Sequence, residues 1–107
     1  HDASIDLAEA KLLSDADSLD DIGALGVWRD MRRNILEGRA VDDTVRAWQR
    51  REEYGYWEAR LREAFNLQAS RRLAARRLEA ARRFKQQLAV EREALDLADE
   101  DEEEGGS

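Results

Sequence analysis

The segment from Thr44 to about Leu97 constrains the fold more than any other part of the chain. It contains no proline, a single glycine at Gly55, and residues that favour helix almost throughout. An unbroken helix of this length would extend for about 80 Å, because an α-helix rises about 1.5 Å per residue. The rest of a 107-residue chain is too short to cover such a rod. The segment therefore predicts either association with other chains or a helix that folds back on itself.

Apolar side chains lie on two opposite faces of this segment. At 100° per residue, one face carries Val41, Val45, Trp48, Leu73, Ala80, Ala81, Phe84, Leu88 and Leu95. The other face carries Tyr54, Trp57, Leu61, Ala64 and Phe65. Either the helix is continuous and partner chains cover its two sides, or it breaks near 66–70, where Asn66 ends one helix and Ser70 caps the next. We favour the continuous helix and keep the broken one, a helical hairpin, as the alternative.

The first 21 residues predict a short helix followed by a turn. Ile5, Ala8 and Leu12 recur at helical spacing, which indicates a helix over about 4–13. Residues 14–21 are rich in Ser and Asp and are typical of a turn with a capping box. A helix this short is marginal alone, so we expect it to pack on the rest of the chain.

A second amphipathic helix is predicted over about 19–37, before Gly38. Its apolar face carries Ala24, Trp28, Met31 and Ile35, with Val27 beside them. We expect this face to pack in the core against the aromatic residues of the long segment.

These elements predict an all-α protein. Two short N-terminal helices pack on a long helix, or on a helical hairpin broken near 66–70, and a disordered acidic C-terminal tail follows. One helical domain spans 1–98, with helices over about 4–13, 19–37 and 44–97, and the tail with a Gly-Gly-Ser linker or tag remnant spans 99–107. The composition agrees, because 40% charged residues without proline are typical of long helices and coiled coils.

Residues for the common catalytic chemistries are scarce. The only histidine is His1 and there is no cysteine, so we expect no Ser–His or Cys–His pair. Asp15 and Asp17 begin like a calcium-binding loop, but Asp20 stands where that loop needs glycine and Gly26 where it needs glutamate. We therefore expect no enzyme activity, cofactor, metal or small-molecule substrate.

The hydropathy and cysteine content give an expectation about the compartment. No stretch approaches the roughly 18 consecutive apolar residues that a membrane span needs. We therefore expect no membrane association. The lack of cysteine favours a reducing environment, so we expect a cytoplasmic, or otherwise intracellular, protein.

Charge is arranged in blocks along the chain. Residues 1–30 are acidic, 31–68 nearly neutral, 69–90 basic and 91–107 acidic. Arginines suit phosphate binding, but those of the basic block also flank an apolar stripe, as long side chains do at the edge of a helix interface. Their partner is therefore either protein carboxylate or nucleic-acid phosphate. The net charge of −7 favours protein.

We therefore expect a non-catalytic assembly or adaptor protein that acts by protein–protein interaction or self-association, as a homo-oligomer or a subunit of a larger assembly. The expected interface residues are Trp57, Leu61, Phe65, Leu73, Phe84, Leu88 and Leu95. The alternative is a nucleic-acid-associated helical factor, with the acidic tail competing for its basic block. The polyanion-binding residues would then be Arg71, Arg72, Arg76, Arg77, Arg82, Arg83 and Lys85.

Overall fold

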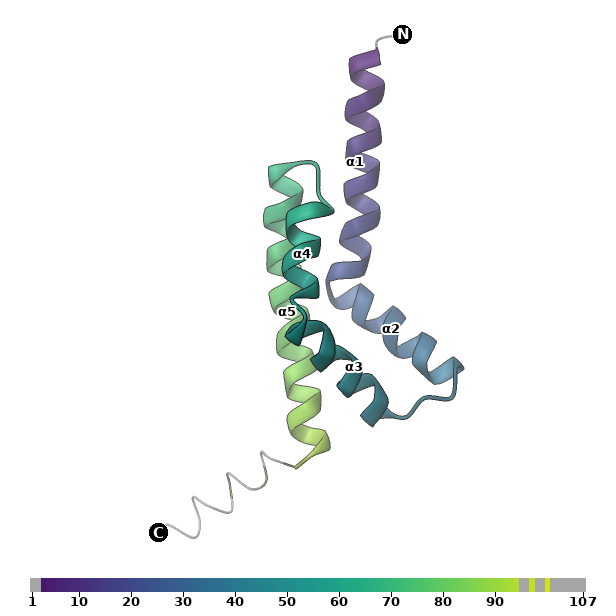
Figure 1. Cartoon of the computed structure of the whole chain (residues 1–107), viewed down its shortest axis with the longest axis vertical. Helices are drawn as coiled ribbons and strands as arrows, with labels where there is room; N and C mark the ends of the chain where they lie inside the picture. Colours follow the sequence, from purple (N-terminus) through teal and green to yellow (C-terminus); the bar gives the residue numbers. More distant parts are fainter. Residues whose placement is uncertain (1–2, 95–96, 98–99, 101–107) are drawn as a thin grey trace.

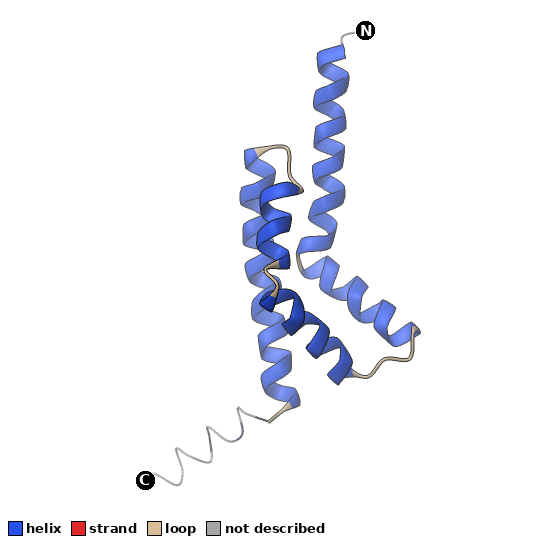
Figure 2. Cartoon of the chain, in the orientation of Figure 1, coloured by secondary structure: helices blue, strands red, loops and turns tan. Residues whose placement is uncertain are grey.

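The computed structural model describes residues 3–94 together with Leu97 and Glu100, and in this part of the chain it is helical and has no strand (Figures 1 and 2). The helices are α1 (Ala3–Ile22), α2 (Ala24–Leu36), α3 (Val41–Glu53), α4 (Tyr56–Glu63) and α5 (Gln68–Arg92). The predicted all-α fold is confirmed. Apart from Glu100, the predicted acidic tail over 99–107 lies outside the described residues. Residues 95 and 96, near the predicted helix end at 97, lie outside them as well.

Helix α5 organises the fold, because it contacts each of the other four described helices. In Figure 1, α3 and α4 lie along one side of α5, while α1 and α2 form a bent arm beside them. Ion pairs reinforce this arrangement at both ends of α3. Arg82 of α5 binds Glu52 and Glu58, and Arg92 of α5 pairs with Asp42.

The predicted continuous helix over 44–97 is wrong, because the chain turns back between α4 and α5. The turn occupies 64–67, close to the break that the alternative placed near 66–70. Leu67, not Ser70, is the N-cap residue of α5. The reversal explains the two apolar faces, since it lets Trp57 and Phe65 pack against Leu78 in one cluster.

A second break, at Gly55, separates α3 from α4. Gly55 has a φ of +66°, a left-handed conformation that costs a residue with a side chain more than it costs glycine. Tyr54 ends α3 and donates its backbone N–H to the carbonyl of Arg50. The sequence prediction treated this glycine as tolerated within one helix, whereas here it ends one helix and begins another.

Helix α1 is longer than predicted, and it runs through the expected turn at 14–21. The Asp and Ser side chains that suggested a turn make tertiary contacts instead. Asp15 is fully buried, and Ser18 donates a hydrogen bond to the carbonyl of Ala64, 3.4 Å away. The second helix consequently begins at Ala24 rather than near 19, after a bend at Gly23.

Two small clusters form the core. The first joins Ile22, Trp57, Phe65, Ala74 and Leu78, with Leu19, Leu61 and Ala64 packed against it. The second joins Val27, Trp48 and Ala81, with Met31 and Leu88 at its edge. Tryptophans therefore anchor both clusters.

The first half of α1 projects beyond the turn between α4 and α5 (Figure 1). Residues 6–14 are all exposed, including Leu7, Leu12 and Leu13. This leaves one apolar helical segment without cover from the described part of the chain. Over the same part of the chain, no helix combines the length and the apolar character needed to cross a bilayer.

Candidate functional site

Asp15 caps the start of α5 from a distance of about fifty residues in sequence. Its Oδ1 accepts a hydrogen bond from the backbone N–H of Asn66 at 2.7 Å, and its Oδ2 accepts one from Leu67 at 3.0 Å. Burial raises the pKa of Asp15, but hydrogen bonds from Asn66, Ser70 and Leu67 outweigh burial and lower it. The carboxylate stays charged and satisfies amides at a helix N-terminus, which is a structural role.

Asp30 is a second buried carboxylate, and it joins α2 to α3. It accepts a hydrogen bond from Trp48 Nε1 at 2.8 Å and one from Arg51 Nη1 at 2.9 Å, and Arg33 also binds it. Burial raises the pKa of Asp30, but the hydrogen bonds of Trp48 and Arg51, with the charges of Arg51 and Arg33, lower it overall. Asp30 is therefore a charged carboxylate whose hydrogen bonds connect α2 to α3.

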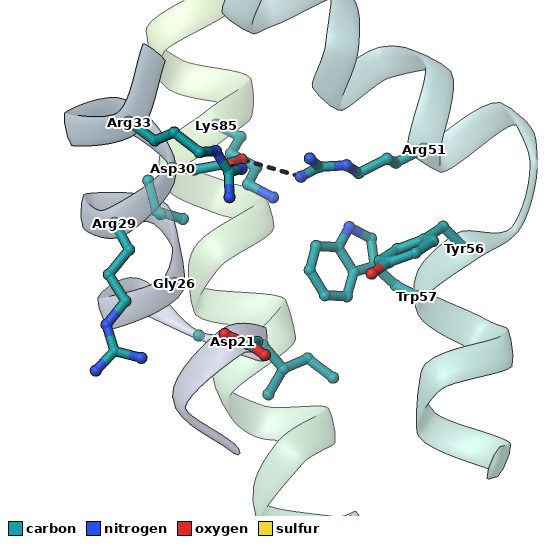
Figure 3. Close-up of a pocket in the computed structure, with 12 residues that line it drawn as sticks. Asp21, Gly26, Arg29, Asp30, Arg33, Arg51, Tyr56, Trp57 and Lys85 are labelled. Carbon is teal, nitrogen blue, oxygen red and sulfur yellow. Dashed lines mark hydrogen bonds and ion pairs between the residues drawn. The ribbon is translucent and has the colours of Figure 1, made fainter. Parts of the chain in front are cut away.

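A cavity of about 220 Å³ opens next to Asp30 (Figure 3). Its walls come from the end of α1, one side of α2, the α3–α4 region and α5. The lining residues are Asp21, Ile22, Gly23, Gly26, Val27, Arg29, Asp30, Arg33, Arg51, Tyr56, Trp57 and Lys85. Four of them are cations and two are carboxylates, so the cavity has an excess of positive charge.

Lys85 lines this cavity, and its ammonium group lies over the rings of two tryptophans. Its Nζ lies 4.8 Å from the ring centroid of Trp57 and 5.2 Å from that of Trp48. Burial, followed by the positive charge of Arg51, lowers the pKa of Lys85. Among the described residues, no carboxylate makes an ion pair with Lys85.

The indole of Trp57 is almost fully buried, and its Nε1 has no hydrogen-bond acceptor within the described structure. This contrasts with Trp48, whose Nε1 binds Asp30. In Figure 3 the edge of the Trp57 ring that carries the nitrogen is turned toward Arg51. The Trp57 ring therefore lines the cavity, while its N–H group is a covered donor without an acceptor.

Helix α2 packs with its polar side inward. Its buried residues are Val27, Asp30 and Asn34. Its exposed apolar residues, called the α2 apolar face below, are Leu25, Trp28, Ile35 and Leu36. At 100° per residue these two sets lie on nearly opposite sides of the helix.

The expectation that Trp28 and Ile35 pack in the core is therefore wrong, since they are 57% and 73% exposed. Two contacts fix the rotation of α2. Asp30 is held by α3, and Gly26 lies so close to α1 that an added Cβ would be 2.2 Å from the carbonyl oxygen of Asp21.

The structure distributes the expected interface residues over several environments. Trp57 and Phe65 belong to the first core cluster, and Leu61 packs against it, so their apolar surface is covered within the chain. Leu88 packs at the edge of the second cluster, and Leu73 is half-buried. Only Phe84, at 48%, is exposed among those described, and Leu95 lies outside the described residues.

The basic block is likewise divided. Arg71 donates to the carbonyls of Leu61 and Phe65 at 2.9 and 2.8 Å, where it closes the C-terminal turn of α4. Arg82 is held by Glu52 and Glu58, and Lys85 faces the cavity. The members left on the surface of α5 are Arg72, Arg76, Arg77 and Arg83, of which Arg83 lies 3.6 Å from Glu79.

Sequence reasoning missed both the cavity and the α2 apolar face. Val27, Asp30 and Asn34 do recur at helical spacing, which is the one signal that could have marked them as a buried face. The apolar residues at helical spacing gave a stronger signal than these three residues.

No protein family, characterised protein or solved structure matches the chain.

Proposed function

We propose that this chain is a non-catalytic interaction module that associates through the α2 apolar face. The observation that carries the proposal is the outward orientation of Trp28 and Ile35 on a helix whose inward side holds Asp30 and Asn34. A contiguous apolar patch rimmed by polar residues is typical of a protein-binding surface.

The shape of this surface suits insertion of apolar side chains. Trp28, Met31, Arg32, Ile35 and Leu36 line a shallow depression. Covering one large apolar side chain contributes about 1.5–3 kcal/mol, and tryptophan is common among the residues that dominate binding energy. Trp28 and Ile35 are the expected anchors.

The partner that we favour is a second copy of this chain. The projecting half of α1 exposes Leu7, Leu12 and Leu13 on different sides of the helix, and its charged residues Asp6, Glu9 and Lys11 give a net charge of −1. Exposed arginines accompany the α2 apolar face, with Arg32 inside it and Arg29 and Arg33 at its edge. Acidic apolar α1 and basic apolar α2 are thus complementary, and a two-fold pair would use each contact twice.

The experiment measures molar mass by light scattering over a hundredfold range of concentration. Wild type should move from monomer to dimer, and Trp28→Ala with Ile35→Ala should remain monomeric with unchanged helicity. Tyr54→Ala is the matched control, because Tyr54 is highly exposed but lies outside α2. A monomer at every concentration would contradict self-association, and an unchanged dimer in the double variant would contradict the surface.

The nucleic-acid alternative depends on Arg72, Arg76 and Arg77, which are exposed on α5 and make no ion pair within the described residues. Its test is binding of a random duplex at low and moderate salt, with and without residues 97–107. Steeply salt-dependent binding that is lost when the three arginines become glutamine would favour this alternative. No binding in either form would exclude it.

A further inference from the structure

We propose that the cavity between α2, the α3–α4 region and α5 binds a small oxyanion of the phosphate or sulfate type. This site adjoins the α2 apolar face, because Arg29 and Arg33 lie at the border of both, but its test does not require self-association. Three independent features support it: the charge of the cavity wall, its spare hydrogen-bond donors and its size.

The charge of the wall exceeds what the protein itself neutralises. Arg29, Arg33, Arg51 and Lys85 face Asp21 and Asp30, which leaves two positive charges among the lining residues. Asp20, outside the wall, lies 3.8 Å from Arg29 and offsets part of this excess. Lys85 makes no ion pair with a carboxylate in the described structure, although the charges of Asp30 and Glu52 act on it from a greater distance. A bound oxyanion would neutralise the positive charge that remains.

The arginines around the cavity have N–H groups that Asp30 does not use. Arg33 and Arg51 each use one terminal nitrogen on that carboxylate, whereas a guanidinium carries five N–H groups. The planar fork of arginine matches the oxygens of phosphate and sulfate. Trp57 contributes its ring to the cavity wall, whereas its Nε1 is covered and lacks an acceptor in the described structure.

The size of the cavity favours a compact anion over a larger ligand. Its volume of about 220 Å³ lies below the range of about 300–1,000 Å³ that is typical of sites for larger organic ligands. Its charged lining also disfavours an apolar occupant, because burying these groups beside hydrocarbon would leave them without partners.

The two lysines of the chain provide a matched test, since Lys85 lines the cavity and Lys11 is exposed on α1. Inorganic phosphate is titrated into the full chain by calorimetry, with potassium chloride of equal ionic strength as the reference. We expect saturable phosphate binding that weakens at least about tenfold in Lys85→Gln and is unchanged in Lys11→Gln. In nuclear magnetic resonance spectra, the Trp57 indole N–H signal should shift with the same midpoint while that of Trp28 stays fixed.

A second pair keeps the test decisive if Lys85→Gln unfolds. Arg29→Gln changes the cavity rim, whereas Arg32→Gln removes the same charge from a neighbouring position of α2 outside the cavity. Weaker phosphate binding in the first variant alone supports the site. Equal effects of phosphate and chloride, no saturation, or equal loss in Arg29→Gln and Arg32→Gln would overturn it and indicate a cavity filled by water.

Discussion

Trp48 donates its indole N–H to the carboxylate of Asp30 over 2.8 Å, and this buried bond fixes how α2 is rotated on the rest of the molecule. Because Asp30 also binds Arg51 and Arg33, a polar residue occupies the inward side of α2 at low cost. The α2 apolar face is turned outward as a consequence. The bond between Trp48 and Asp30 thus holds α2 on α3 and also explains why the α2 apolar face is exposed.

Removing the acceptor of this bond should destabilise the protein strongly. Asp30→Ala leaves Trp48 Nε1 and two guanidiniums without their partner, and breaking a buried charge pair costs about 3–5 kcal/mol. Because the arginines are partly exposed, we expect a loss near the lower end of that range. Urea unfolding measures the change. A loss below about 1 kcal/mol, the value of an ordinary hydrogen bond, would contradict the role of Asp30.

The two buried tryptophans should respond differently to loss of the indole N–H. Trp48→Phe removes a hydrogen bond and leaves Asp30 with one donor fewer, at a cost of about 1 kcal/mol beyond packing. Trp57→Phe removes a donor that has no acceptor among the described residues, so its cost should come from packing alone. Urea unfolding in phosphate-free buffer compares the two. A larger loss for Trp57→Phe would contradict this contrast.

Stability should fall in acid because the pKa values of Asp15 and Asp30 are lowered by folding. A carboxyl group of lowered pKa stabilises the fold above its unfolded value of about 3.9, and that stability is lost as pH falls through the folded value. The free energy of unfolding should therefore decline below about pH 4. In Asp15→Asn the decline should be smaller, and an identical decline would show that Asp15 does not contribute.

Much of the fold could be predicted because it depends on local signals. Gly38 follows the end of α2, Asp42 and Asp43 lie in the first turn of α3, and the stretch after Ser70 is one long helix. Long-range contacts decide the remainder. The local sequence predicts a turn at Asp15, because its partners at the start of α5 lie about fifty residues away in sequence.

The same limit explains why the sequence did not predict the outward orientation of Trp28 and Ile35. Trp28 and Ile35 form the stronger apolar pattern of α2, and nothing local indicates that Asp30 would be satisfied by Trp48 and Arg51. The interface expected at Trp57 and Phe65 followed from a helix without a break. Because the chain reverses at 64–67, Trp57 and Phe65 pack in one core cluster, and exposed apolar side chains lie on α2 instead.

Two glycines should differ in their tolerance of alanine. In Gly26→Ala the new Cβ would lie 2.2 Å from the Asp21 carbonyl oxygen, so α1 and α2 must move apart. We expect a loss of about 1–3 kcal/mol, as for an overpacked core, together with a changed α2 orientation. In Gly55→Ala the space is open and only left-handed backbone strain remains, about 1 kcal/mol.

Circular dichroism during urea unfolding measures both variants. The binding of phosphate provides a second readout, because Gly26 lines the cavity and Gly55 does not. Gly26→Ala should weaken binding, whereas Gly55→Ala should leave it near the wild-type value. Equal destabilisation with equal binding would contradict the close packing of α1 on α2.

The exposure of Trp28 at different protein concentrations tests the central claim most directly. The full chain labelled with 5-fluorotryptophan gives one fluorine signal for each of Trp28, Trp48 and Trp57, and a soluble paramagnetic agent broadens those that solvent reaches. In dilute solution Trp28 should broaden strongly while the two core tryptophans do not, and at high concentration Trp28 should become protected. Protection of Trp28 in dilute solution would show that α2 packs the other way round. Broadening at every concentration would show that no second copy covers it.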